Sequence, residues 1–186
     1  NRLRCIANTS LNSLGVQVEN GDLRKRESLG TRKYDVVISQ RTLINLLDLQ
    51  HQQTALHNIQ SLLSIGGIYI SIEAFNSGLD NLNKARIEFG FEKIEPAHHN
   101  LYLEDDFFQT PNLAPWPPAD KVVKPNEFST HYYVSRVLHD VFLLATKSEF
   151  KRNSEFVKYF SSAMPDGIGD YSPLRVHVLQ KIKSDD

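Results

Sequence analysis

The stretch YDVVIS (residues 34–39) decides the fold class, because it is a β-branched run without polar alternation at its centre. Such runs are typical of parallel strands that are buried on both faces. The stretch IYISI (residues 68–72) has the same character. Between them, apolar residues recur at helical spacing from Asp48, a favoured N-cap residue, and Gly66 and Gly67 are expected to end the helix. Strand, helix and strand predict a parallel pair and the α/β class.

The chain before this unit is predicted to form a helix and a short strand. An apolar stripe predicts a helix over residues 1–14, which Gly15 ends in the left-handed conformation. Residues 16–18 alternate as a strand does, and the strand end is expected at residues 19–23. The basic segment 24–33 is interpreted as a solvated surface loop rather than a phosphate site.

The chain after the unit continues the layered pattern within one domain, residues 1–186. Five prolines between residues 109 and 126 break regular structure, so we expect a long loop or lid at about residues 105–130. The remaining predicted elements are a helix over residues 79–89, an edge strand over 90–96, a strand passing into a helix over 132–143, a helix over 154–160, and a final strand over 174–179 after a turn at 169–173.

Composition limits the classes of function. Of 186 residues, 21 are basic and 22 acidic, and the net charge of -1 favours a small-molecule substrate over nucleic acid or anionic lipid. The single cysteine, Cys5, fits a reducing compartment, and no apolar run approaches the roughly 20 residues of a membrane span, so we expect a cytoplasmic protein. No metal-ligand spacing stands out. The oligomeric state is not predicted.

Candidate ligand residues follow from a rule for open parallel sheets, in which ligands bind beyond the carboxyl ends of the strands. Asp22 follows Gly21, and its carboxylate can accept hydrogen bonds from an exocyclic amine, although a Gly-Asp pair is also common in turns. Gln40 could face a ligand's ammonium group. Arg41 could clamp a carboxylate or form a surface ion pair.

Three segments together resemble class I S-adenosylmethionine-dependent methyltransferases. They are NGDLR (residues 20–24), YDVVISQR (34–41) followed by LINL (43–46), and LLSIGGIYI (62–70), and GDYSPL (169–174) resembles the closing antiparallel hairpin. The resemblance implies a Rossmann-like, mostly parallel sheet with a C-terminal antiparallel strand and S-adenosyl-L-methionine as the cofactor. It also implies which residues hold the cofactor: Asp22 and Leu23 the adenine, and Ser39, Gln40 and Arg41 the methionine end.

The sequence departs from this family at its beginning. The family's first strands and glycine-rich loop would precede Asn1, and no Gly-x-Gly-x-Gly pattern occurs in the chain. A sheet without its central first strand leaves a seam of unpaired backbone groups, which is costly when buried. We therefore expect the natural polypeptide to be longer at its N-terminus.

Acceptor-binding candidates lie after the second strand and beyond it. Glu73 and Asn76 follow the strand, and His98, His99 and Tyr102 come after the predicted edge strand. His99 is the candidate catalytic base, because the ordinary histidine pKa lies near neutrality, although a structural or solvent-exposed pair explains these histidines as well. After the lid, Tyr132 could wall an aromatic or sugar acceptor or pack in the core.

The predicted function is methyl transfer from S-adenosylmethionine to a small-molecule acceptor, such as a sugar or another hydroxyl-bearing metabolite. One alternative is a non-catalytic, methyltransferase-like domain that binds a protein partner. A nicotinamide-dependent oxidoreductase is disfavoured, because the chain has neither a Tyr-x-x-x-Lys pair nor a Gly-x-Gly-x-x-Gly motif.

Overall fold

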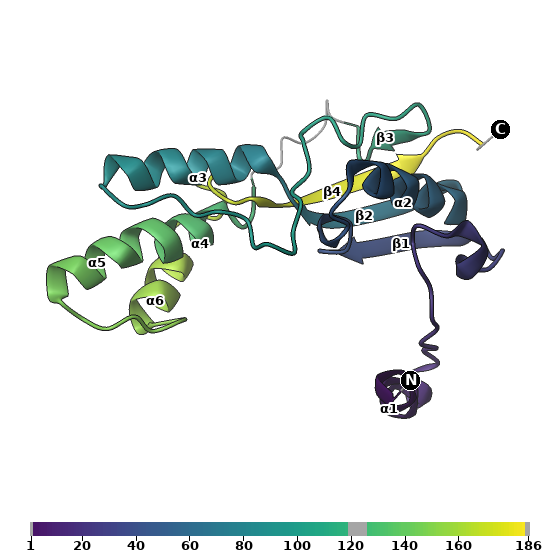
Figure 1. Cartoon of the computed structure of the whole chain (residues 1–186), viewed down its shortest axis with the longest axis horizontal. Coiled ribbons are helices and arrows are strands. Elements are labelled where there is room, and N and C mark those ends of the chain that lie inside the picture. Colours follow the sequence, from purple (N-terminus) through teal and green to yellow (C-terminus); the bar gives the residue numbers. More distant parts are fainter. Residues whose placement is uncertain (1, 119–125, 185–186) are drawn as a thin grey trace.

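A four-stranded mixed sheet forms the centre of the computed structural model, which describes residues 2–118 and 126–184 (Figure 1). The strands lie in the order β1 (Tyr34–Gln40), β2 (Leu63–Ala74), β4 (Leu174–Lys181) and β3 (Leu113–Pro115). β1 and β2 are parallel, whereas β4 is antiparallel to both of its neighbours. The predicted α/β class, the parallel pair and the C-terminal antiparallel strand are therefore confirmed, as is a Rossmann-like arrangement.

Six α-helices surround or extend this sheet in the described part of the chain. They are α1 (Arg2–Leu11), α2 (Leu49–Leu62), α3 (Asn76–Glu88), α4 (Ser129–Tyr133), α5 (His139–Thr146) and α6 (Glu155–Ala163). One π-helical segment (Val134–Leu138) joins α4 to α5, and short 3-10 turns occupy Asn12–Leu14, Arg26–Leu29 and Leu43–Asn45.

Helix α2 connects the parallel strands as predicted and begins at the predicted cap. The Asp48 side chain accepts a hydrogen bond from the His51 backbone at 2.9 Å, which satisfies one of the free N–H groups of the first turn. The helix ends at Leu62, four residues before Gly66, because β2 already starts at Leu63. Gly66 and Gly67 instead lie where the β1–β2 register shifts, and a Cβ on Gly67 would come within 3.1 Å of the Asp35 carbonyl oxygen.

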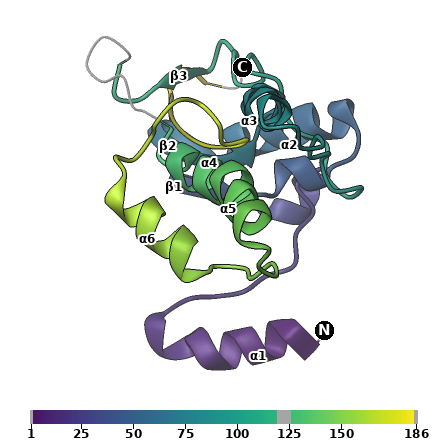
Figure 2. The same ribbon diagram turned by 90° about the vertical axis from the view of Figure 1, so that its left-hand side faces the viewer.

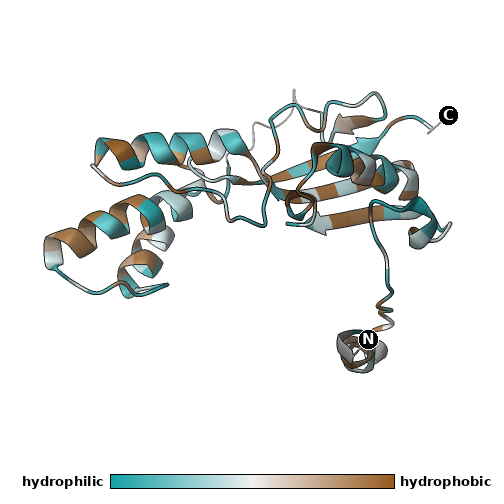
Figure 3. Cartoon of the chain, in the orientation of Figure 1, coloured by the Kyte–Doolittle hydropathy of each residue, from teal (hydrophilic) through white to brown (hydrophobic). Residues whose placement is uncertain are grey.

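The two faces of the sheet differ in their environment. On one face Tyr69 and Leu179 are buried in a core with Leu56 and Ile59 of α2. On the other face Val36, Ile38 and Val176 remain 52%, 63% and 40% exposed, and Figure 3 shows apolar bands along these strands. The prediction that β1 is buried on both faces is therefore wrong. Strand β1 is an edge strand, and no described helix covers its second face.

Residues 129–146 are helical throughout, so the strand predicted at the start of residues 132–143 is absent. Val134 and Val137, three residues apart, are both wholly buried, and Val137 packs with Leu82 and Ala85 of α3. The apolar run thus has helical rather than strand periodicity. The Arg86 guanidinium reaches the Asp140 carboxylate at 2.7 Å and ties α3 to α5.

Two other predicted strands are also absent, and asparagine side chains replace their strand partners. The Asn8 amide holds both backbone groups of Val18, at 2.6 and 3.1 Å, so residues 16–18 need no sheet. Asn83 pairs in the same way with Ile94, at 2.8 and 3.0 Å, within the predicted edge strand 90–96. An edge strand forms instead at β3, inside the proline-rich segment, where residues 119–125 lie outside the described part of the chain.

The predicted N-terminal helix is confirmed as α1 and the following turn, and Gly15 has the expected positive φ of 68°. Figure 2 shows α1 standing apart from the sheet, joined to it by an extended segment. The predicted helices over 79–89 and 154–160 are confirmed as α3, which begins three residues earlier, and α6.

Candidate functional site

The carboxyl ends of β1 and β2 meet at one edge of the sheet. The backbone N–H of Arg41, the residue after β1, donates to the Ile72 carbonyl at 2.8 Å, and Arg41 takes a positive φ of 49°. The next residues form the 3-10 turn Leu43–Asn45. Gln40 and Arg41 are exposed at this edge.

Glu73 is a structural anchor of this edge rather than a free ligand group. Its side chain is wholly buried, and its Oε1 accepts the backbone N–H groups of Thr42 at 3.0 Å and Leu43 at 3.2 Å. Ser39, 7% exposed, donates to the same oxygen and bonds the Tyr69 hydroxyl at 2.7 Å. Burial raises the pKa of Tyr69 to about 12. Both Ser39 and Glu73, predicted to contact cofactor and acceptor, are thus occupied within the protein.

A cavity of about 720 Å³ opens between α2 and the segment 101–112. Asn76 and Tyr102, two predicted acceptor-binding residues, are part of its lining. The Asn76 amide donates to Glu104 Oε1 at 2.7 Å, which fixes it at the start of α3. The other residues of the lining are Leu49, Gln52, Gln53, Leu56, His57, Gln60, Leu101, Glu104, Asp106, Phe107, Gln109, Thr110, Pro111 and Asn112.

Tyr132, His98 and His99 are three further predicted residues. Burial is the main cause of a raised Tyr102 pKa, which the nearby Tyr132 raises further and Arg41 lowers. Tyr132 and Arg41 are therefore within electrostatic reach of the Tyr102 hydroxyl. In contrast, His98 and His99 are exposed, pack edge to face with ring centroids 5.0 Å apart, and are not among the lining residues.

Asp22 and Leu23 lie at the other end of the sheet. The Leu23 carbonyl accepts from the Asn58 amide at 2.7 Å, and Asn58 lies nine residues into α2, about 14 Å from its start. Because α2 starts beyond the carboxyl end of β1, this contact places Leu23 towards the amino end, where the chain enters β1 in Figure 1. Arg24 forms a two-pronged ion pair with Asp22 and holds the pKa of that carboxyl well below its usual range.

The five residues assigned to the cofactor by resemblance therefore do not form one site. Ser39 is occupied by Tyr69 and Glu73, Asp22 is occupied by Arg24, and Leu23 lies far from Gln40. Ser39, Gln40 and Arg41 all stand at the expected edge, and of these three Gln40 and Arg41 are exposed. In this arrangement Gln40 and Arg41 are placed to contact the methionine end of S-adenosylmethionine, whereas Asp22 and Leu23 do not reach the same edge.

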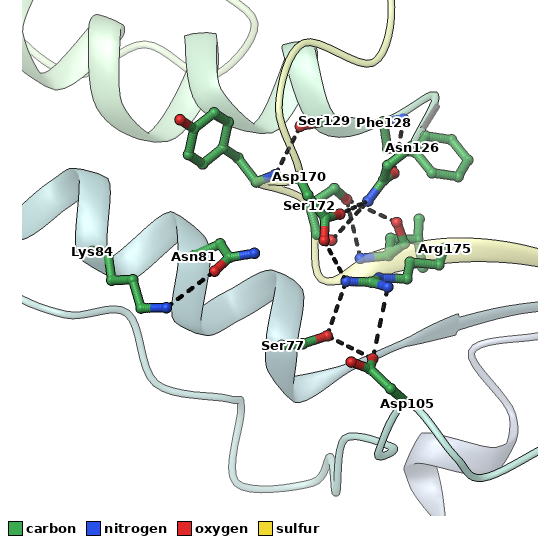
Figure 4. A network of polar contacts seen from close by, with 12 residues as sticks. Ser77, Asn81, Lys84, Asp105, Asn126, Phe128, Ser129, Asp170, Ser172 and Arg175 are labelled. Atoms are coloured by element: carbon green, nitrogen blue, oxygen red, sulfur yellow. Dashed lines mark hydrogen bonds and ion pairs between the residues drawn. The ribbon is translucent and has the colours of Figure 1, made fainter. Parts of the chain in front are cut away.

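A second cavity, of about 420 Å³, lies beside β4 and contains none of the predicted site residues. Arg175 and His177 are in its lining. Arg175 binds Asp170 at 2.6 Å and Ser77 at 2.9 Å, in the polar network that Figure 4 shows between α3 and the segment before β4.

Several lining residues of the larger cavity were missed by sequence reasoning. Gln52 and Gln60 are buried, at 1% and 4% exposed, and Glu104 and Asp106 bring carboxylates to the rim. The signal available was the acidic-aromatic run EDDFF (residues 104–108), which ends two residues short of the first proline, Pro111. No group of three or more His, Cys, Asp or Glu suited to a metal ion occurs in the described ranges. Within the same ranges, no helix is long and apolar enough to span a membrane.

Comparisons with known proteins find matches among solved structures. No family model matches the sequence, and no curated protein does. A crystal structure from Galdieria sulphuraria, described as a proposed sarcosine dimethylglycine methyltransferase, is similar at 12% sequence identity and a TM-score of 0.47. The match covers 94% of this chain and 64% of that one, so the chain spans less than two thirds of that protein.

Proposed function

We propose that this chain provides the acceptor-binding part of an S-adenosylmethionine-dependent methyltransferase that acts on a small molecule. One observation carries the proposal: a cavity of about 720 Å³ is lined by Asn76, directly after the second of two parallel strands, and by Tyr102. This is the position at which open α/β sheets bind their ligands. Of the segments that resemble class I methyltransferases, residues 34–46 reach this edge.

The cofactor would supply the chemistry, because its sulfonium carries a reactive methyl group, and the protein mainly has to align the reactants. In this chain, Asn76 and Tyr102 would orient the acceptor, and Gln40 and Arg41 would lie towards the donor. The sequence predicts a hydroxyl-bearing acceptor such as a sugar, with His99 as the base. Because His99 is exposed and outside the cavity lining, we propose a small-molecule acceptor and assign no base. We propose no nucleic-acid or membrane partner, and a cytoplasmic location.

One observation favours a second candidate function, that of a methyltransferase-like domain without catalysis. Asp22 and Leu23, which the resemblance assigns to adenine, lie at the end of the sheet opposite to Gln40 and Arg41. A domain that binds a partner or small ligand has no need of an assembled donor site. The two candidates differ in whether the chain binds the methyl donor.

Calorimetric titration of S-adenosylhomocysteine into the chain tests the proposal. We expect measurable binding, weakened about tenfold or more by Arg41→Ala, since a charge-assisted contact of a ligand is lost. Asp22→Ala is the matched control and should leave the affinity unchanged, because its carboxylate pairs with Arg24. Absence of binding would support the non-catalytic alternative. Weaker binding by Asp22→Ala would show that residues 15–33 rearrange around the ligand.

A further inference from the structure

The lining of the 720 Å³ cavity has an uneven charge. Glu104 and Asp106 contribute carboxylates, and among the described residues of the lining there is no Lys or Arg. Arg41 lies within electrostatic reach of Tyr102 but is outside the lining. A ligand with a positive charge would therefore meet attraction in this cavity and an anion would meet repulsion.

The placement of these two carboxylates is determined by the residue between them. Asp105 Oδ1 accepts from the Ser77 hydroxyl at 2.6 Å and lies 3.7 Å from the Arg175 guanidinium, in the network of Figure 4. Asp105 is absent from the cavity lining, whereas Glu104 and Asp106 are both part of it. Asp105 thus attaches the segment to α3 and to β4, whereas the side chains of Glu104 and Asp106 line the cavity.

Two buried amide side chains add further hydrogen-bond acceptors. The Gln52 amide nitrogen donates to the carbonyls of Leu43 at 3.2 Å and Leu101 at 2.8 Å, and the Gln60 amide nitrogen donates to Thr110 at 3.1 Å. Within the described residues, neither amide oxygen accepts a hydrogen bond from the protein, although Gln52 is 1% and Gln60 4% exposed. Since both residues line the cavity, these oxygens are available to a donor there.

Aromatic side chains complete the lining. Tyr102 and Phe107 are half-buried and border the same space. The faces of aromatic rings attract cations. Carboxylates, free amide oxygens and aromatic rings together recognise a ligand that carries positive charge and N–H donors on an apolar body.

We propose that this cavity binds an organic cation with N–H donors, that is, a protonated primary or secondary amine. This inference deepens the proposed function, because Asn76 and Tyr102 belong to the same site, and it names a class of ligand for that site. The binding step itself requires only the residues of this cavity.

The test compares benzylammonium with benzyl alcohol, which has the same ring without the charge, by calorimetry in the absence of any methyl donor. We expect the cation to bind at least about tenfold more tightly than the alcohol. The double variant Glu104→Gln/Asp106→Asn should lose about tenfold in affinity for the cation, as expected for two partly exposed ion pairs. Both side chains are exposed, so the fold should be retained, which thermal melting followed by circular dichroism would check.

The matched control is Glu149→Gln/Asp166→Asn, which changes the net charge equally at exposed residues outside the cavity lining. Equal binding of cation and alcohol would overturn the proposal, as would an unchanged affinity in the Glu104/Asp106 variant. An equal loss in the control variant would also overturn it, because net charge alone would then explain the binding. If the amine binds but S-adenosylhomocysteine does not, the inference that the cavity binds amines is supported and the methyltransferase proposal fails.

Discussion

The carboxylate of Glu73, at the end of β2, accepts the backbone N–H of Thr42 at 3.0 Å and so holds the turn that follows β1. The same carboxylate accepts the N–H groups of Leu43 and Ile44. One wholly buried acidic side chain therefore satisfies most of the donors of the 3-10 turn Leu43–Asn45. The edge that carries Gln40 and Arg41 depends on it.

Glu73→Gln should destabilise the fold by about 2–3 kcal/mol, because a charge-assisted acceptor is lost and the new amide has only one acceptor oxygen. Urea unfolding followed by circular dichroism measures this loss. Glu95→Gln, at an exposed site, should change the free energy of unfolding by less than about 0.5 kcal/mol. Equal stability of the two variants would contradict the anchoring role of Glu73.

Gln52→Ala should cost about 1–2 kcal/mol, because the Leu43 and Leu101 carbonyls lose their common donor. It should also loosen the segment 101–112, and limited proteolysis would detect faster cleavage there. The neighbouring Gln53 is exposed, so Gln53→Ala is the matched control and should behave as the wild type. Similar cleavage rates in both variants would show that Gln52 does not attach this segment.

His177 should make stability depend on pH. Burial, and then Arg175, lower the pKa of His177 from 6.5 to about 4. Between pH 6.5 and pH 4, His177 is protonated in the unfolded chain but neutral in the folded chain. The free energy of unfolding therefore falls as the pH drops below 6.5. The contribution is about 2 kcal/mol between pH 7 and pH 5. His177→Phe should reduce this pH dependence in urea unfolding, whereas His57→Gln, at an exposed residue, should keep it.

Gly78→Ala tests the packing of α3 against the segment before β4. Alanine normally stabilises a helix by about 1 kcal/mol relative to glycine. Here the new Cβ would lie 2.1 Å from the Ser172 carbonyl oxygen, so the substitution should instead destabilise the protein by about 2 kcal/mol or more. A raised melting temperature would show that the two backbones are not in contact. Asp80→Ala, at an exposed site of the same helix, should have little effect.

The sequence predicts the β1–α2–β2 unit well, because its signals are local: two β-branched runs, an apolar helical period and the Asp48 cap. The failures involve side chains from elsewhere in the chain. Asn8 and Asn83 form hydrogen bonds with backbone groups of segments that the sequence predicts as strands. Each of these contacts joins residues ten or more positions apart, so local patterns do not reveal it. The strand expected at the start of residues 132–143 is helical instead, since a strongly apolar stretch fits either element until its partner is known.

For the candidate site, Tyr102 lines the cavity although the edge strand predicted before it is absent. The rule about strand ends singled out Asn76, which also lines the cavity. It did not find Gln52 or Gln60, because polar residues on a helix are ordinarily solvated and only the packing of segment 101–112 buries them. The resemblance assigns Asp22 to the adenine of the cofactor. The contact between Leu23 and Asn58 instead holds this part of the chain away from Gln40 and Arg41.

The second, uncovered face of the sheet has a consequence for how the strands find their register. Val36 and Ile38 on that face are at least as apolar as Val37 and Ser39 on the buried face, so a slip of one residue in β1 would still bring apolar side chains to the core. Hydrophobicity therefore cannot distinguish the correct pairing of β1 with β2. The discrimination falls to polar contacts, since only one register brings Ser39 to the Tyr69 hydroxyl and to Glu73. In this sheet a few buried hydrogen bonds therefore favour the correct strand register over a register shifted by one residue.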